Sequence, residues 1–259
     1  MARKEQGPQK GANRAGEQAK GTRREVVLSG IGVGLMLLGA WGPWVPHPIA
    51  GLSLNLWDLV EVVQYLPAVR AGTQSVTREL FFLPLWAGGL ALAWLLSRSP
   101  GREGTASEAV SRAARLSSPL KRFLPLALPL FLIALTLPPY PDTLTGYGSA
   151  EFRGRFYLSW AGILLVLLSP LRGRLPHRLG EGLFILLGLG GALLPLWQYL
   201  GVRDDLARVY SLPLGWGWGL LATLAGGVVL AASGLVSLAQ RRDGQGGRWP
   251  TTRRGRARR

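Results

Sequence analysis

The residues of this chain that are best suited to catalysis or ligand binding are two pairs of carboxylates. Asp58 and Glu61 stand three residues apart in one polar segment, and Asp204 is followed directly by Asp205 in another. A pair of carboxylates can share acid–base work on a substrate, and carboxylate oxygens are ligands for hard cations. These four residues are therefore the candidates for polar contacts with a ligand or substrate on the outer face of the protein.

The residues around both pairs also support a purely structural interpretation. Asn55 followed by Asp58 resembles the cap of a helix, and polar residues recur at every third position after it. This pattern predicts a short amphipathic helix over 55–66 that lies in the outer membrane interface with its acidic stripe facing water. Arg203 and Arg208 flank the second pair and would neutralise it. We therefore predict no catalytic, cofactor-binding or metal-binding residue.

Other common chemistries lack the residues they need. The chain has no cysteine, which excludes disulfides, thiolate metal sites and cysteine nucleophiles. Of its two histidines, His47 lies between two prolines and is predicted to be a turn residue, and the topology derived below puts His177 on the opposite side of the membrane. The sequence contains no G-x-S-x-G, H-E-x-x-H or phosphate-binding G-x-x-x-x-G-K-[ST]. We therefore expect no cofactor.

The elements that must position these residues are membrane helices. Of 259 residues, 48% are hydrophobic and only 17% are charged, against roughly 25% charged in soluble domains. A membrane-spanning helix needs about 20 mostly apolar residues. Six segments reach or approach this length: 26–45, 80–96, 123–137, 156–171, 183–200 and 212–240. The predicted fold class is all-α, a polytopic transmembrane helical bundle.

Basic residues indicate how the bundle is oriented. The net charge is +16, and loops on the cytoplasmic side of a membrane collect Lys and Arg. When both termini and every second loop are assigned to one side, that side holds 24 of the 30 basic residues. We therefore predict three hairpins that close outside, with both termini cytoplasmic, in a bacterial-type cytoplasmic (inner) membrane. Basic residues near the inner ends of the spans are predicted to contact anionic lipid headgroups: Arg23, Arg24, Arg98, Lys121, Arg122, Arg172, Arg241 and Arg242.

The two ends of the chain, residues 1–25 and 241–259, are basic and lack hydrophobic periodicity. This composition predicts disordered cytoplasmic tails. Arginine-rich tails can neutralise nucleic-acid phosphates, but the positive-inside topology already accounts for the charge. The expected partners are the lipid bilayer, anionic headgroups and further membrane subunits or a second copy, with no specific nucleic acid.

Aromatic residues and glycines complete the membrane pattern. Tryptophans and tyrosines gather at the predicted outer ends of the spans, where amphipathic rings anchor helices at headgroup level. Gly30 with Gly34, and Gly215 with Gly219, have the four-residue spacing that lets membrane helices approach closely. The spacing predicts close helix packing, within the chain or with partner subunits.

These observations favour a structural role in a membrane. No predicted span carries a charged residue near its centre, which disfavours an ion-coupled pump. The leading hypothesis is a non-enzymatic assembly, scaffold or accessory subunit of a membrane complex. The alternatives are a permease component for apolar or lipid-like substrates, and a small membrane enzyme that acts on lipid-linked substrates through the outer-loop carboxylates.

Overall fold

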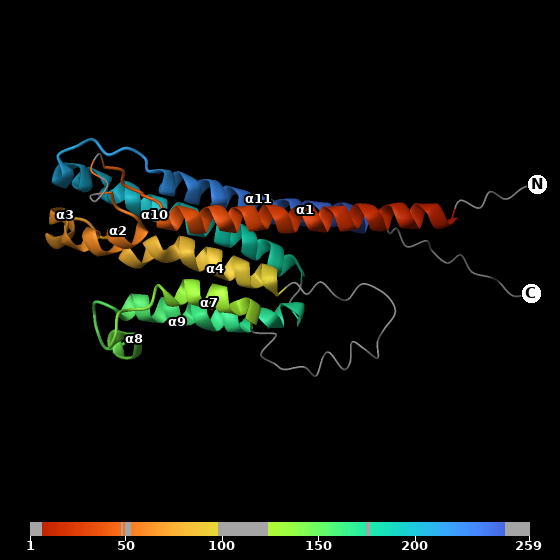
Figure 1. Cartoon of the computed structure of the whole chain (residues 1–259), viewed down its shortest axis with the longest axis horizontal. Coiled ribbons are helices and arrows are strands. Elements are labelled where there is room, and N and C mark those ends of the chain that lie inside the picture. The colour runs from red at the N-terminus through yellow and green to blue at the C-terminus, as the bar shows by residue number, and fades with distance from the viewer. Residues whose placement is uncertain (1–6, 48, 50–52, 98–123, 175–176, 247–259) are drawn as a thin grey trace, which may run out of the picture.

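The computed structural model describes residues 7–47, 49, 53–97, 124–174 and 177–246, and this part of the chain is all-helical (Figure 1). Five helical segments are long and apolar enough to cross a membrane: Arg24–Trp41 in α1 (Gly7–Trp41), Arg78–Leu96 in η3 (Arg78–Phe82) and α4 (Leu83–Leu96), Arg153–Leu171 in α9 (Arg153–Leu168) and η5 (Ser169–Arg174), Leu179–Tyr210 in α10 (His177–Tyr210), and Trp218–Gln240 in α11 (Trp218–Gly246). The predicted all-α membrane fold is confirmed at this level.

The predicted span 123–137 does not reach the same length. Its helical part is the apolar segment Leu124–Ala134, made of η4 (Leu124–Leu126) and α7 (Ala127–Ala134). A helix of this size rises about 16 Å, against a hydrocarbon thickness of about 30 Å. Pro138 follows soon after, and a proline disfavours helical geometry in the residue before it. By length, the described residues therefore hold five candidate spans, where the sequence predicted six.

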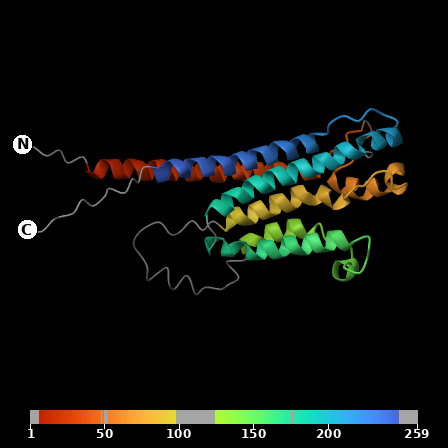
Figure 2. The ribbon, with the colours of Figure 1, turned by 180° about the vertical axis from the view of Figure 1, so that it is seen from behind.

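Four of the long helices pack together, and the remaining helical pair lies on one flank (Figures 1 and 2). α1 has its most extensive contact with α11, which also packs along α10. α4 contacts α1 and α10, and it also carries α7 and α9. α4 is accordingly the most buried of the candidate spans and α9 the most exposed.

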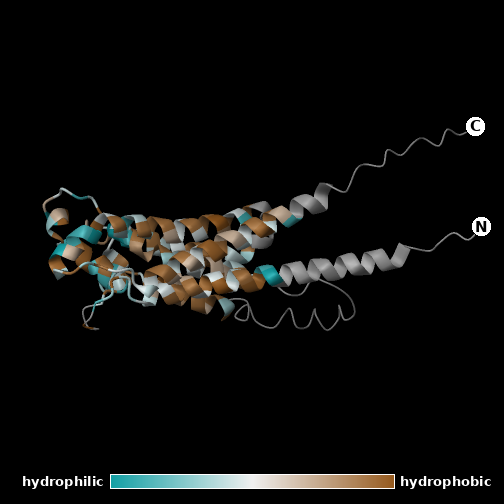
Figure 3. Cartoon of the chain, turned by 90° about the horizontal axis from the view of Figure 1, so that it is seen from above, coloured by the Kyte–Doolittle hydropathy of each residue, from teal (hydrophilic) through white to brown (hydrophobic). Residues whose placement is uncertain are grey.

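The segments that follow α1, α7 and α10 turn back at the same end of the molecule (Figure 1). We call this the capped end; it comprises residues 42–47, 53–82, 138–152 and 198–217. The start of α1 and the end of α11 lie at the opposite end. Hydrophobic residues run along the middle of the bundle, and hydrophilic ones gather at the capped end (Figure 3).

Glycines bring α1, α10 and α11 into backbone contact, but not at the positions predicted on α1. A β-carbon added at Gly226 of α11 would lie 2.5 Å from the backbone nitrogen of Met36 and 2.7 Å from the carbonyl oxygen of Gly32. The predicted pair Gly30 and Gly34 has no atom within 4 Å of such a β-carbon. The close-packing face of α1 therefore lies on the opposite side from the one that the Gly30–Gly34 spacing indicated. Further close approaches join Gly39 of α1 to Gly219 of α11, and Gly188 of α10 to Gly227 of α11. Of the predicted pair Gly215 and Gly219, only Gly219 makes such a contact, because Gly215 precedes α11.

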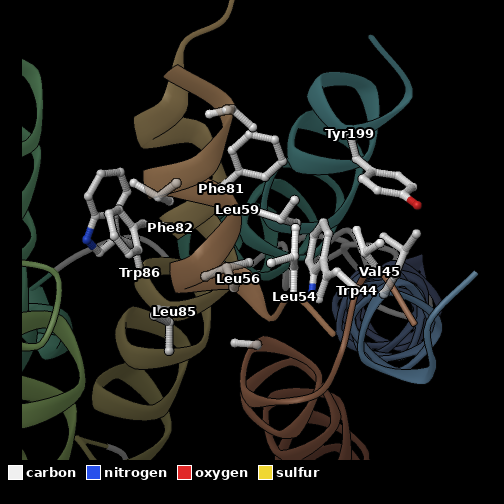
Figure 4. Packing of buried hydrophobic residues seen from close by; sticks show 14 of the residues in the cluster. Trp44, Val45, Leu54, Leu56, Leu59, Phe81, Phe82, Leu85, Trp86 and Tyr199 are labelled. Carbon is white, nitrogen blue, oxygen red and sulfur yellow. The ribbon is translucent and has the colours of Figure 1, made fainter. Parts of the chain in front are cut away.

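The first segment at the capped end folds onto the bundle. α2 (Leu56–Val62), η2 (Val63–Tyr65) and α3 (Pro67–Arg70) occupy the region where a helix over 55–66 was predicted. Leu56, Leu59 and Val60 of α2 are buried in the main hydrophobic cluster, with rings from the segment after α1, from η3, α4 and α10 (Figure 4). The buried side of α2 shares this cluster with Trp44, Phe81 and Tyr199, so its apolar partner here is the protein itself. The position of the helix relative to the membrane interface stays a prediction.

Three of the observed helices extend beyond their predicted bounds. α10 runs over 34 residues, or about 51 Å, and therefore extends well beyond the predicted segment 183–200. Its last turns bury Val202 and Leu206, four residues apart, against the cap, so the expected loop after residue 200 is helical. α1 begins at Gly7 and α11 ends at Gly246, so helix extends into both segments predicted as disordered tails.

Candidate functional site

The four predicted carboxylates all lie at the capped end, on two separate helices. Asp58 and Glu61 are on α2, whereas Asp204 and Asp205 are on the last turns of α10. Among the described residues, no three His, Asp or Glu side chains are grouped so that they could hold a metal ion. The structure therefore does not gather the predicted carboxylates into one site, and the partners of each decide what it does.

Asp58 caps α2, as the sequence predicted. The Asn55 side-chain oxygen accepts hydrogen bonds from the backbone nitrogens of Trp57, at 2.9 Å, and of Asp58, at 3.1 Å. In return, the Asn55 backbone nitrogen donates to Asp58 Oδ2 at 3.0 Å. This reciprocal pair satisfies backbone donors that the helix start leaves open, and such caps contribute about 1 kcal/mol. Asp58 is thus engaged in local structure.

Glu61 pairs with Arg155, a residue that the sequence pattern did not single out. Arg155, near the start of α9, is 9% exposed. Its Nη1 lies 3.4 Å from Glu61 Oε1, and its Nε donates to the carbonyl oxygen of Thr136 at 2.7 Å. Its guanidinium carbon lies 4.8 Å from the ring centre of Phe82, a cation–π arrangement. Arg155 therefore ties α2, η3 and the end of the α7 segment to α9.

A small buried hydrogen-bond network surrounds the Thr136 carbonyl. The Trp86 indole nitrogen donates to Thr136 Oγ1 at 2.7 Å, and the Thr136 and Ser159 hydroxyl oxygens are 2.9 Å apart. The Ser159 hydroxyl also donates to the Thr136 carbonyl oxygen at 3.1 Å. These bonds join α4, α7 and α9 at one point. They satisfy polar groups that would otherwise be costly to bury.

Arg78 makes a second set of links at the same boundary. Its Nη1 donates to Gln64 Oε1 at 2.6 Å and lies 3.6 Å from Glu151 Oε1, and its Nε lies 3.7 Å from Glu79 Oε1. Its guanidinium group also donates to the Glu151 carbonyl oxygen and lies 5.7 Å from the ring centre of Phe152. We call Arg78, Arg155, Glu61, Glu79 and Glu151 the arginine network. It pairs each of its carboxylates with an arginine and fastens the α2–η3 segment to the α7–α9 pair.

In the second predicted pair, on α10, one carboxylate forms an ion pair and the other is exposed to solvent. Asp205 Oδ1 lies 2.9 Å from Arg208 Nη1, one turn later, so the predicted neutralisation by Arg208 holds for this residue. Arg203 turns away from the carboxylates, and its Nη2 donates to the Leu214 carbonyl oxygen at 2.8 Å. Asp204 is exposed and has no ion pair among the described residues. Neither carboxylate points to a shared ligand.

His47 occupies a turn. Its Nδ1 accepts a hydrogen bond from the Ile49 backbone nitrogen at 3.1 Å, and its ring centre lies 5.4 Å from that of Tyr210. These contacts fit the turn role predicted for it. His177 begins α10, and its side chain lies outside the described part of the structure.

Most of the residues predicted to contact lipid headgroups have side chains outside the part of the chain that the structure describes. Arg24 is exposed at the first position of the candidate span Arg24–Trp41, a place that suits a headgroup contact. The side chains of four others lie outside the described part: Arg23, Arg172, Arg241 and Arg242. Arg98, Lys121 and Arg122 are outside the described residues altogether.

The part of the chain that the structure describes is all-helical and holds five helices long and apolar enough to span a membrane. Comparison with protein-family models, with curated proteins and with solved structures finds no match to this chain. The sequence analysis missed Arg155 and Arg78 as organising residues. Arg155 could have been recognised by its position, because it lies in the first turn of an apolar helix, where an unpaired charge is costly.

Proposed function

We propose that the chain crosses a bacterial-type cytoplasmic membrane six times, as three hairpins that close at the capped end, with both termini cytoplasmic. The distribution of 24 of 30 basic residues to the opposite side supports this orientation. The sixth crossing would be the Leu124–Ala134 segment, which packs beside α4 and α9. A short apolar segment can cross where the bilayer thins or where neighbouring helices cover it.

The absence of cysteine makes this topology directly testable. We expect Ala150→Cys, between α8 and α9, to react with a membrane-impermeant maleimide in intact cells. Val110→Cys, at a position between α4 and η4 in the sequence, should react only after the membrane is permeabilised. Reaction of the Ala150→Cys protein only after permeabilisation would contradict the six-span arrangement.

Within this membrane we propose a non-enzymatic role as an assembly, scaffold or accessory subunit of a membrane complex. The observation that carries the proposal is the use of the candidate carboxylates as structural partners: Asp58 caps α2, Glu61 pairs with Arg155 and Asp205 pairs with Arg208. The long helices meet through glycine backbone contacts, which favours a rigid bundle. A fixed shape that presents exposed helix faces suits a subunit whose task is to hold partners.

The two competing proposals receive less support from this geometry. A lipid-linked-substrate enzyme would need outer carboxylates free to meet substrate, and three of the four candidates have partners. A permease component for apolar or lipid-like substrates would need α1, α10 and α11 to separate, and their glycine contacts oppose this.

Purification from the native membrane with an affinity tag tests the role. We expect a stoichiometric membrane partner to co-purify in mild detergent, both with the wild-type chain and with a variant carrying Asp58→Asn, Glu61→Gln, Asp204→Asn and Asp205→Asn. The amides keep hydrogen-bond acceptors in place while removing the charges. A monodisperse lone monomer would contradict the subunit role. Loss of cellular function in a normally expressed variant that still binds its partner would favour the enzyme instead.

A further inference from the structure

The segment between α7 and α9, residues 138–148 with the short helix α8 (Asp142–Thr145), exposes large side chains. Tyr140 is 84% exposed, Leu144 64% and Tyr147 56%. Asp142 is the only charged residue among these eleven positions. Tyrosine presents an apolar ring with a polar tip, a combination that suits the boundary between lipid headgroups and acyl chains.

This exposure belongs to a well-connected segment. The Thr143 hydroxyl donates to the Pro138 carbonyl oxygen at 2.6 Å. The Gly146 backbone nitrogen donates to the Asp142 carbonyl oxygen at 2.8 Å, and the Gly148 nitrogen to the Thr145 carbonyl oxygen at 3.0 Å. The backbone bonds to itself, so the Cα positions from which these side chains project are well defined.

The segment is bonded to the flank of α9, inside the start of its candidate span. The Trp160 indole nitrogen donates to the Thr143 carbonyl oxygen at 3.3 Å, and the Tyr147 and Phe156 ring centres are 5.9 Å apart. Trp160 stands about 10 Å along the helix from Arg153, and its side chain leans back toward the helix start. The Thr143 carbonyl therefore lies beside the first turns of the candidate span. Figure 1 shows α8 next to the start of α9.

The flank of α9 that receives this segment faces away from the rest of the protein. Tyr157, Leu164 and Leu168, spaced as one face of a helix, are all exposed. In the membrane topology proposed above, on which this inference rests, we take lipid rather than a partner subunit to contact this face of α9. The exposed surface of residues 138–148 is continuous with this lipid-facing side of α9.

We propose that residues 138–148 form an interfacial foot, which binds the phospholipids of the leaflet at the capped end. Leu144 inserts toward the acyl chains, and Tyr140 and Tyr147 lie at headgroup level. The low charge of the segment makes its transfer from water to this interface inexpensive. The foot would hold the most exposed hairpin of the bundle at a defined depth and tilt.

Full-length single-cysteine proteins, labelled with an environment-sensitive fluorophore, test the proposal. In vesicles of phosphatidylcholine and phosphatidylglycerol with doxyl-labelled phosphatidylcholine, we expect the label at Leu144→Cys to be quenched by lipid. The matched control is Tyr65→Cys on η2, since Tyr65 is 68% exposed and Leu144 64%. Lipid quenching at position 144 should be about threefold stronger than at 65, because interfacial segments lie about 5–10 Å into the headgroup–acyl boundary. Aqueous iodide should show the reverse order.

A third label, at Leu164→Cys on the lipid-facing side of α9, separates the foot from the span. Strong lipid quenching at 164 with equal quenching at 144 and 65 would overturn the foot while leaving α9 in the membrane. Absence of lipid quenching at position 164 would show that this side of α9 does not contact lipid, and it would overturn the proposed foot as well. Greater iodide quenching at 144 than at 65 would also overturn the proposal.

Discussion

Replacing Gly226 by alanine is expected to destabilise the folded bundle by about 1–3 kcal/mol, and replacing it by leucine to prevent α1 and α11 from packing at all. The added β-carbon would lie 2.5 Å from the Met36 backbone nitrogen, a distance that real side chains do not adopt. The two nearest atoms, the Met36 nitrogen and the Gly32 carbonyl oxygen, both belong to the backbone, so turning the Met36 side chain aside would not relieve the contact. The two helices would have to separate along their most extensive contact.

The separation would also strain bonds beyond the glycine. The Ser29 and Ser233 hydroxyl oxygens are 2.9 Å apart across the same helix pair, and both residues are buried. Gly32 faces the backbone of Leu230 one turn from Gly226. Each of these contacts depends on the helix spacing that Gly226 permits, so the loss should be cooperative.

Gly30→Ala and Gly34→Ala are the matched controls. Both positions lie on α1 with no atom within 4 Å of an added β-carbon. Because alanine is favoured over glycine in a helix by about 0.5–1 kcal/mol, these variants should be neutral or slightly more stable. Denaturation by sodium dodecyl sulfate in mixed micelles, followed by circular dichroism, measures all three. Equal destabilisation by Gly30→Ala and Gly226→Ala would contradict the packing described above, because it would mean that the face of α1 with Gly30 and Gly34 is also closely packed.

This contrast also shows what local sequence can and cannot predict about membrane helices. The spans are recognisable because an apolar run must match the thickness of hydrocarbon, which depends on composition alone. The packing face depends on which residues of another helix lie opposite. In a chain with 36 glycines, the spacing of Gly30 and Gly34 is therefore no guide to the face that packs, and Gly32 and Gly39 make the contacts.

The capped end divides in the same way between local and tertiary causes. The Asn55–Asp58 cap was predictable because both partners lie within one turn. The helical end of α10 was missed because Arg203, Asp204 and Asp205 suggest a loop, while Val202 and Leu206 become informative only once the cap offers them an apolar surface. The 55–66 segment was correctly predicted to be helical, but the burial of its apolar side chains against the protein was not predicted, because amphipathicity does not tell protein from lipid as the apolar partner.

Arg155→Met is expected to destabilise the protein by about 2–3 kcal/mol, because a hydrogen bond from a charged donor contributes about 1.5–3 kcal/mol when buried. The lost bond is the one from Nε to the Thr136 carbonyl oxygen, at 2.7 Å. Contact with the Phe82 ring adds to the loss, and methionine retains part of the packing volume. The control is Arg153→Met, two residues earlier and exposed; its Nε donates to the Tyr147 carbonyl oxygen at 3.2 Å, an exposed bond, so this variant should change stability by less than about 0.5 kcal/mol.

The ion pair with Glu61 should account for little of this effect. The Glu61 side chain is 56% exposed, so solvent screens the pair and limits it to about 1 kcal/mol or less. Glu61→Gln should therefore be nearly neutral in the same detergent titration, and the Arg155→Met, Glu61→Gln double variant should resemble Arg155→Met alone. A coupling energy above about 2 kcal/mol between the two positions would contradict this division. Under that division, Arg155 holds the α7–α9 pair to the cap through the Thr136 carbonyl, and Glu61, the candidate that the sequence suggested, is an accessory to it.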